Sequence, residues 1–317
     1  MSIIINQYKK LLVHRYDDDH IVKYLSYKDF NGLKCEEISF KTKEENVIKG
    51  AFYFYEGFNE EELVILCHGL GGGHTSYMRE IEFLCKKKYR VLSYDNTGCF
   101  NSSGKDIRGF SESLNCLSSV LSFIENHDCL KKLKLHIIGH SWGGFTASNI
   151  YAFHSKNIYS ICAISPFISI EVILNDFMKG KFKFVQRKCL KYEKQVNEKY
   201  ALSSALNALK DTKANVLIIH SKDDPIVPFE TNTKVLMNNI NNKNVKFLIV
   251  DNKGHNPNYK KEASKYMNET FATYNKLIKE KKLSSFEDKK RYMEEKDLFK
   301  MTEQDEEIWE EIINNMK

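Results

Sequence analysis

Short apolar runs recur along the chain, and their lengths predict a sheet with helices between its strands. Eight runs have the length and composition of strands: 36–40, 47–55, 63–67, 90–94, 133–138, 159–164, 216–220 and 245–250. A short polar turn joins the first two, which predicts an antiparallel hairpin. Most later runs are apolar almost throughout, as expected of parallel strands that are buried on both faces.

Segments with apolar residues at helical spacing lie between these runs, at 79–88, 108–126, 148–154 and 230–239. Alternation of strands and helices is typical of α/β proteins, in which helices cover both faces of a parallel sheet. We therefore predict an α/β fold with a mostly parallel, eight-stranded sheet that begins with the antiparallel hairpin. The length of 317 residues suits one large domain, 1–317.

Two regions depart from this alternation. Residues 167–212 are too long for one crossover helix, and an apolar helical face is followed there by the basic stretch 179–199. We interpret 167–212 as a helical cap inserted over the carboxyl edge of the sheet, with two ordinary surface helices as the alternative. Residues 280–317 are a charged, helical C-terminal extension, in which 280–300 is expected to be a mobile connection. Beyond it, a helical stripe should dock on the body: Ile308, Trp309, Ile312 and Ile313.

Composition excludes several classes of function. The net charge is +6, and basic and aromatic residues form no patterned stripe, which argues against nucleic-acid binding. No apolar run approaches the ~18 residues of a membrane span, and residues 1–6 lack the charge and length of a signal peptide. We therefore expect a cytoplasmic protein with no stable membrane insertion. The eight cysteines contain no C-x-x-C pair and are expected to be reduced thiols, and no metal-ligand spacing is visible.

The segment Gly139-His140-Ser141-Trp142-Gly143 carries the first sign of chemistry, because it joins a predicted strand to a helix rich in small residues. A serine on so sharp a turn is raised clear of the sheet, and the glycines permit the strained backbone and close helix packing. The start of the helix also stabilises negative charge. Ser141 is therefore the candidate nucleophile.

A serine nucleophile needs a base, and the base needs an acid that orients it. His255 follows the last predicted strand, and the preceding strand leads into the loop 220–228 with Asp223 and Asp224. Both loops belong at the same sheet edge as Ser141, because parallel strands point the same way. The spacing to the following Pro-Ile-Val-Pro favours Asp224 as the acid over Asp223.

The third predicted strand ends in the glycine-rich loop 68–74, which suits the stabilisation of an oxyanion. Glycines let the backbone approach a substrate, and the amides of Leu70 and Trp142 are the expected donors. The loop lacks the lysine and the spacing of a phosphate-binding P-loop. The oxyanion interpretation is therefore preferred.

These three motifs together resemble the α/β-hydrolase family over about residues 36–275. Residues 95–104 are similar to the family's D-x-R-G-x-G-x-S-x-G loop, although Thr97 stands where the family has arginine and Phe100 where it has the second glycine. The glycine-rich loop and helical cap are most similar to carboxylesterases and monoacylglycerol-lipase-type enzymes. The resemblance implies a Ser-His-Asp serine hydrolase with neither a metal nor an organic cofactor.

We therefore expect hydrolysis of a small-molecule carboxylic ester or acyl substrate by Ser141, His255 and Asp224. A thioesterase, a serine peptidase or amidase, and a non-catalytic ligand-binding protein are the alternatives. Apolar cap residues favour a medium-chain or aromatic acyl group, unless they only attach the cap to the body: Phe167, Ile170, Leu174 and Phe177. No feature of the sequence indicates an oligomeric state.

Overall fold

The computed structural model describes residues 12–17, 24–179 and 183–317. Residues 1–6, on which the expected absence of a signal peptide rests, lie outside them, so that expectation stays a prediction. No helix in the described ranges is both long enough and apolar enough to cross a membrane. All eight cysteines are free thiols, and six of them are buried.

One eight-stranded sheet forms the centre of the molecule, with the strand order β1-β2-β4-β3-β5-β6-β7-β8. The β1–β2 and β2–β4 pairs are antiparallel, and all other neighbours are parallel, which confirms the predicted fold class. The strands are β1 (Lys34–Lys41), β2 (Val47–Phe54), β3 (Glu62–Cys67), β4 (Arg90–Tyr94), β5 (Lys134–His140), β6 (Ile158–Ile164), β7 (Asn215–Ser221) and β8 (Val245–Val250).

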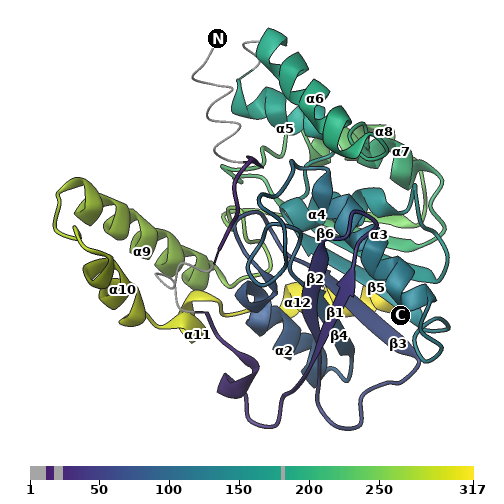
Figure 1. Cartoon of the computed structure of the whole chain (residues 1–317), viewed down its shortest axis with the longest axis horizontal. Helices are drawn as coiled ribbons and strands as arrows, with labels where there is room; N and C mark the ends of the chain where they lie inside the picture. The colour runs from purple at the N-terminus through teal and green to yellow at the C-terminus, as the bar shows by residue number, and fades with distance from the viewer. Residues whose placement is uncertain (1–11, 18–23, 180–182) are drawn as a thin grey trace.

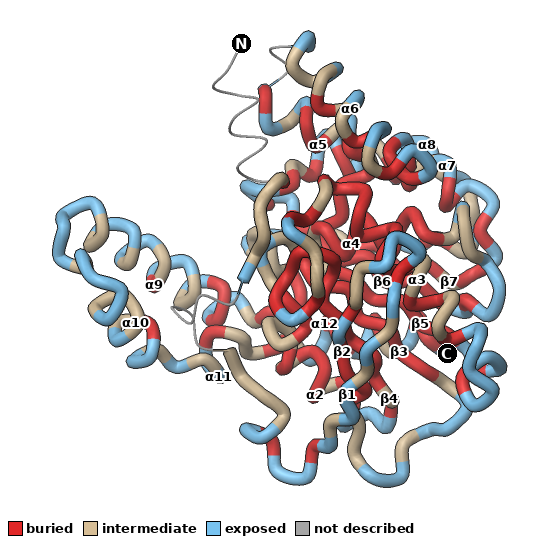
Figure 2. Tube along the Cα trace, viewed as in Figure 1, coloured by how far each residue is buried: buried red, intermediate tan, exposed pale blue. Residues whose placement is uncertain are grey.

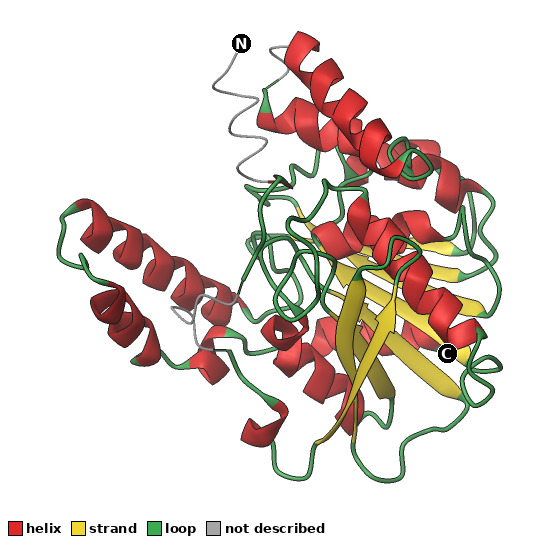
Figure 3. Cartoon of the chain, viewed as in Figure 1, coloured by secondary structure: helices red, strands yellow, loops and turns green. Residues whose placement is uncertain are grey.

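Helices surround the sheet, and further helices extend beyond it at two places (Figures 1 and 3). Those along the body are α2 (Met78–Lys86), α3 (Glu112–Glu125), α4 (Trp142–Ile150), α7 (Ala205–Lys210), α8 (Thr233–Asn239) and α12 (Glu306–Met316). The cap region carries α5 (Ile170–Phe177) and α6 (Lys183–Asn197). The C-terminal region adds α9 (Lys261–Lys279), α10 (Phe286–Glu294) and α11 (Leu298–Met301). Two short 3-10 helices are η1 (Tyr27–Asp29) and η2 (His74–Tyr77).

Two hydrophobic cores lie on the two faces of the sheet, and strand β3 contributes to both because its side chains alternate. Leu63 and Ile65 belong to the core that includes residues of α3, α4 and the cap. Val64 and Leu66 belong to the core formed with α2 and α12. Figure 2 shows the resulting buried centre and the largely exposed outer turns. Burial on both faces explains why β3 is apolar almost throughout.

The final helix α12 packs against the sheet beside β6 and β7. Ile308, Trp309 and Ile312 are buried there, as expected of an apolar stripe. The indole Nε1 of Trp309 donates to Gln304 Oε1 at 2.7 Å. The side chain of Asn315 donates to the Ile161 carbonyl at 3.2 Å. The end of the chain therefore stabilises the strands that carry the carboxyl-edge loops.

The C-terminal extension is helical, and the segment 280–300, which was predicted to be a mobile connection, contains α10 and most of α11. A capping box begins α10. Ser285 Oγ accepts from the Asp288 N–H at 3.1 Å, and Asp288 Oδ2 accepts from the Ser285 N–H at 3.2 Å. The hydroxyl of Tyr292 donates to the Thr270 carbonyl of α9 at 3.2 Å. Helices α9 and α10 thus pair in an arm that projects from the body (Figure 1).

Helix α3 begins at Glu112, four residues later than the predicted 108–126 segment. Arg108 and Gly109 have φ values of +53° and +99°, which lie outside the right-handed helical region. The buried carboxylate of Glu193, in helix α6 of the cap, accepts from the Phe110 N–H and holds the loop that precedes α3.

Glu80 on α2 is buried against the segment that leads into α12, with 3% of its surface exposed. It accepts a hydrogen bond from Asn258 Nδ2 at 3.3 Å. Burial raises the pKa of Glu80 to about 7, although hydrogen bonds from its neighbours oppose the shift. The folded protein therefore retains a proton on Glu80 at pH values where the unfolded chain has released it.

We predict that stability falls as pH rises from about 4.5 to 7, by up to about 3 kcal/mol from this residue, because unfolding then releases a proton. Urea unfolding at pH 5 and pH 8 measures this difference. Glu80→Gln, which has no such proton, should lose most of it. Glu310→Gln, at an exposed glutamate on α12, should keep the wild-type difference. A Glu80→Gln variant with the wild-type difference would contradict the assignment.

Candidate active site

Ser141 lies between β5 and α4, at the turn that the sequence predicts. Its backbone has φ 57° and ψ −112°, a conformation that is rare for a residue other than glycine. The Ser141 N–H donates to the Ile164 carbonyl at 2.8 Å, and its carbonyl accepts from the Phe145 N–H at 2.9 Å. These bonds to β6 and α4 hold the strained turn in place.

The glycines that flank the turn are required because the surrounding backbone leaves no room for a Cβ atom. A Cβ atom on Gly139 would lie 2.0 Å from the Gly143 carbonyl oxygen, and one on Gly143 would lie 2.0 Å from the Cys67 oxygen. A Cβ on Gly144 would come within 2.8 Å of the Ile164 oxygen. All three contacts are with backbone, which no rotamer change relieves. Glycine is therefore the residue that lets α4 approach β3 and β6 this closely.

His255 and Asp224 come together at the carboxyl edge of β7 and β8. His255 Nδ1 and Asp224 Oδ2 are 2.8 Å apart. Asp223 instead accepts from the Ser221 hydroxyl and from the Gly254 N–H at 3.3 Å. Of the two aspartates, the structure pairs Asp224 with the histidine, whereas Asp223 supports the loop that carries it.

The surroundings of Asp224 favour its charged form. Burial alone would raise the pKa of Asp224, but hydrogen bonds from His220 and His255 and the charge of His255 outweigh it and hold the pKa far below its usual range. The N–H groups of Ile226 and Val227 donate to Asp224 Oδ1 at 2.8 and 3.0 Å. His220, which the sequence analysis did not single out, lies 3.3 Å from Asp224 Oδ2. Asp224 is thus a buried, ionised partner for His255.

Both predicted oxyanion donors lie near Ser141: Trp142 follows it in the chain, and a Cβ on Gly69, which precedes Leu70, would lie 3.5 Å from the Ser141 Cβ. Trp142 is the first residue of α4, so its N–H has no acceptor within the helix. Its indole Nε1 donates to the Phe110 carbonyl at 2.7 Å, which fixes the side chain. Leu70 follows Gly69, and the Gly69 N–H already donates to the Tyr77 hydroxyl at 2.9 Å. The next amide along the loop, that of Leu70, makes no hydrogen bond among the described residues.

His140 brings Ser141 close to His255, because it precedes Ser141 in the chain and contacts the His255 loop. The rings of His140 and His255 have centroids 4.8 Å apart, and His140 Nε2 lies 2.8 Å from the His255 carbonyl oxygen. Among the described residues, the Ser141 hydroxyl makes no hydrogen bond. Catalytic hydrogen bonds are often long in a free enzyme and shorten when substrate binds. The serine turn and the histidine loop are therefore adjacent, with the Ser141 hydroxyl unpaired among these residues.

Comparison with known proteins agrees with the observed fold. A family model described as the alpha/beta hydrolase fold matches residues 62–188. An esterase from Pyrococcus furiosus superposes with a TM-score of 0.60 at 19% identity, over 85% of this chain and 98% of the esterase. The α/β hydrolase GrgF from Penicillium gives 0.55 at 14% identity, over 82% and 99% of the two chains. The chain therefore has the α/β-hydrolase fold.

Curated relatives of this α/β-hydrolase match over a shorter stretch. A proline iminopeptidase from Lactobacillus acidophilus is 31% identical over 114 residues, which are 35% of this chain and 38% of the relative. One from Clostridioides difficile is 30% identical over 98 residues, or 30% and 32% of the two chains. The matches thus span about a third of the relatives' length.

The α/β-hydrolase loop 95–104 keeps its turns despite its departures from the family pattern. Phe100, at the position of the second glycine, adopts φ +42°, and the loop glycines Gly98 and Gly104 have φ +72° and +114°. Arg15, from the N-terminal lead-in, donates to the carbonyls of Ser102 and Gly104 at 2.8 and 2.9 Å, and also to that of Phe100. A guanidinium from outside the loop thus holds it, which no motif in the sequence indicates.

The predicted pocket residues of the cap lie mostly in the core. Phe167, Ile170 and Leu174 are 2%, 0% and 1% exposed, and Phe167 stacks on Phe145 with ring centroids 4.6 Å apart. Phe177 alone is open to solvent, at 48%. The first three therefore pack the cap against the α/β-hydrolase body, which favours attachment over pocket lining for them.

A buried carboxylate fastens the cap beside the serine turn. Glu193 of α6 is fully buried and accepts from the N–H groups of Phe110 and Ser111 at 2.7 and 3.1 Å, and from the Ser111 hydroxyl at 2.5 Å. The Phe110 carbonyl in turn receives the Trp142 indole. The cap is therefore linked through one residue to the proposed oxyanion donor. The basic composition of 179–199 concealed this acidic anchor.

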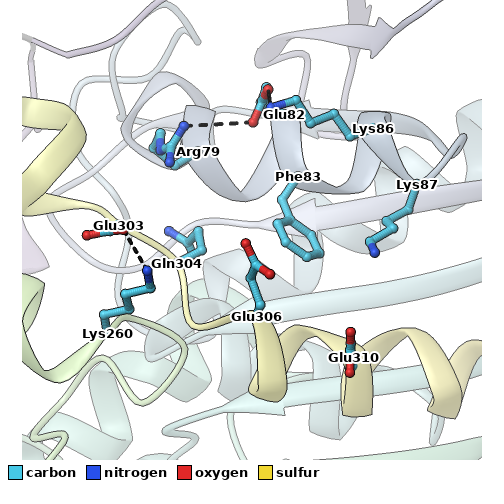
Figure 4. Close-up of a pocket in the computed structure, with 10 residues that line it drawn as sticks. All are labelled: Arg79, Glu82, Phe83, Lys86, Lys87, Lys260, Glu303, Gln304, Glu306 and Glu310. Carbon is cyan, nitrogen blue, oxygen red and sulfur yellow. Dashed lines mark hydrogen bonds and ion pairs between the residues drawn. The ribbon is translucent and has the colours of Figure 1, made fainter.

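A separate groove of about 350 Å³ lies between α2 and the start of α12 (Figure 4). Ion pairs already form there, from Arg79 to Glu82 at 3.8 Å and from Lys260 to Glu303 at 2.7 Å. Its lining is rich in charge of both signs: Arg79, Glu82, Phe83, Lys86, Lys87, Lys260, Glu303, Gln304, Glu306 and Glu310. None of these is a candidate catalytic residue, so the groove is distinct from the site around Ser141.

Gly143→Ala tests the packing of the serine turn. Because the new Cβ would meet the Cys67 oxygen at 2.0 Å, we expect a loss of more than about 3 kcal/mol in unfolding free energy, or no folded protein. The control is Gly72→Ala, whose Cβ would meet the flexible Ser76 hydroxyl at 3.1 Å and should cost much less. Urea unfolding followed by circular dichroism measures both. A Gly143→Ala protein as stable as Gly72→Ala would refute the steric account.

Proposed function

We propose that this protein is a serine hydrolase that cleaves small-molecule carboxylic esters through an acyl-enzyme intermediate. The observation that carries the proposal is the 2.8 Å contact between His255 Nδ1 and Asp224 Oδ2, next to a serine in a strained turn at a helix N-terminus. An ionised carboxylate on Nδ1 leaves Nε2 free to act as the base. This is the arrangement that activates a serine hydroxyl.

In this mechanism His255 Nε2 takes the proton of Ser141 as its hydroxyl oxygen attacks the acyl carbon. Asp224 fixes the histidine tautomer and stabilises the imidazolium that forms. The N–H groups of Leu70 and Trp142 donate to the oxyanion of the tetrahedral intermediate. His255 then protonates the departing alcohol oxygen. Water repeats the sequence on the acyl-enzyme, releases the acid and restores Ser141.

An aminoacyl-amide substrate is the second candidate, because the curated relatives that match are proline iminopeptidases. Removal of an N-terminal residue calls for a carboxylate that binds the free ammonium group of the substrate. The buried carboxylate of α6, Glu193, already accepts three hydrogen bonds from Phe110 and Ser111. Glu193 is therefore not available to bind such an ammonium group.

We predict that a fluorophosphonate probe labels Ser141 and that Ser141→Ala loses both labelling and turnover of p-nitrophenyl esters, because the nucleophile is gone. Peptide mapping by mass spectrometry locates the adduct. A panel of p-nitrophenyl esters of graded chain length, run beside proline p-nitroanilide, separates the two substrate classes. An adduct on another residue would exclude the mechanism, and faster cleavage of the anilide would exclude ester hydrolysis as the main activity.

Asp224→Asn should lower kcat on the order of 1,000- to 10,000-fold, because an amide neither holds the required His255 tautomer nor balances its charge. Asp223→Asn is the matched control next in the chain, and it should keep kcat within about tenfold since Asp223 contacts only the loop. Steady-state ester hydrolysis at pH 7.5 measures both. Equal losses in the two variants would show that Asp224 has no special role.

A further inference from the structure

A half-buried tyrosine and a half-buried histidine outside the proposed triad connect the oxyanion loop, the serine turn and the His255 loop. The Tyr77 hydroxyl lies 2.9 Å from the Gly69 nitrogen and 2.9 Å from His140 Nδ1. His140 Nε2 lies 2.8 Å from the His255 carbonyl oxygen. The chain of contacts therefore begins in the oxyanion loop, passes through the residue before Ser141, and ends on the backbone of the proposed base.

The direction of each hydrogen bond follows from the chemistry of the end groups. A carbonyl oxygen only accepts, so His140 Nε2 carries a proton and donates to His255. In the neutral imidazole, Nδ1 is then an acceptor, and the Tyr77 O–H donates to it. The tyrosine oxygen in turn accepts from the Gly69 N–H. Every donor in the chain has one acceptor, and no proton is left over.

The surroundings of His140 keep it in this neutral form. Burial, with a further contribution from His255, lowers the pKa of His140 to about 3. Burial likewise raises the pKa of Tyr77 above its usual range, so the phenol remains a donor. A protonated His140 would have a hydrogen on Nδ1 that faces the tyrosine O–H. The network therefore has one hydrogen-bonding arrangement across the physiological range.

We propose that Tyr77 and His140 are positioning residues that set the distance between the Leu70 oxyanion donor and His255. Tyr77 also occupies the Gly69 N–H, whereas the Leu70 N–H makes no hydrogen bond among the described residues. The Tyr77 hydroxyl lies very close to the backbone of the oxyanion loop: a Cβ on Gly69 would lie 2.7 Å from the Tyr77 oxygen. Neither side chain takes part in bond making. The inference rests on the proposed hydrolase function.

Tyr77→Phe removes the hydroxyl and keeps the ring, so the Gly69 N–H and His140 Nδ1 lose their partner. We expect kcat for p-nitrophenyl butyrate to fall on the order of 10- to 100-fold while KM changes less than about twofold, because neither of the lost hydrogen bonds is to the substrate. Tyr151→Phe is the matched control: its hydroxyl accepts from the Lys213 N–H at 3.2 Å, away from the site, and wild-type kcat is expected.

The histidine is tested by two substitutions. His140→Gln places an amide nitrogen near the position of Nε2 and keeps a donor for the His255 carbonyl, whereas His140→Leu removes both contacts. We expect His140→Gln to retain several-fold more kcat than His140→Leu. Combining Tyr77→Phe with His140→Gln should cost less than the product of the two single losses, since both break one network. Unchanged kcat in Tyr77→Phe, or losses that simply multiply, would overturn the proposal.

A measurement without turnover separates this proposal from the proposed function. Histidine ¹⁵N NMR spectra of the wild-type protein, assigned with His140→Gln, should show His140 neutral and protonated at Nε2 from pH 5 to pH 8. A charged ring or an Nδ1–H tautomer would overturn the network. Wild-type protein without esterase activity would overturn the hydrolase function and the positioning role together, while the tautomer would still decide the hydrogen-bond scheme.

Discussion

The contact between helix α4 and the ends of strands β3 and β6 is the constraint on which the site depends. Gly143 and Gly144 bring the helix so close to the Cys67 and Ile164 carbonyls that no side chain fits between them. The chain can enter the helix from β5 only through a sharp turn, which places Ser141 at φ 57°. Strain at one residue is held by bonds to β6 and by two hydrophobic cores. The position of Ser141 on the turn and the first N–H of α4, which has no acceptor within the helix, both follow from that packing.

Around this turn, the supporting side chains are buried or half-buried and are held by hydrogen bonds. His220 supports Asp224, Tyr77 and His140 join the oxyanion loop to the His255 loop, and Glu193 links the cap to Phe110, which receives the Trp142 indole. Buried polar groups of this kind are costly when unpaired, so complete pairing makes each loop position well defined. Catalysis by preorganised hydrogen-bond donors requires loops with well-defined positions, because a donor displaced by an ångström loses much of its effect.

The sequence was sufficient to predict the strands, the strand-to-helix serine turn and the placement of the aspartate and histidine loops. Each of these depends on local signals: apolar runs, glycines and the shared direction of parallel strands. The contacts of Arg15 with Ser102, of Tyr77 with His140 and of Glu193 with Phe110 were not predictable. Each joins two residues that are more than 60 positions apart in the chain, and no motif marks them. The C-terminal extension was predicted to be helical, but the bounds of α10 were not predicted although its capping box is local, since the charged surroundings resembled a connection.

The central claim is that Ser141, His255 and the amides of Leu70 and Trp142 act on one acyl group. A crystal structure of the protein after reaction with a fluorophosphonate tests it most directly. The account predicts phosphorus bonded to the Ser141 oxygen, with the phosphonyl oxygen about 3 Å from both amide nitrogens and His255 Nε2 facing the serine oxygen. A phosphonyl oxygen that is bound by neither amide, or an adduct on another side chain, would contradict it.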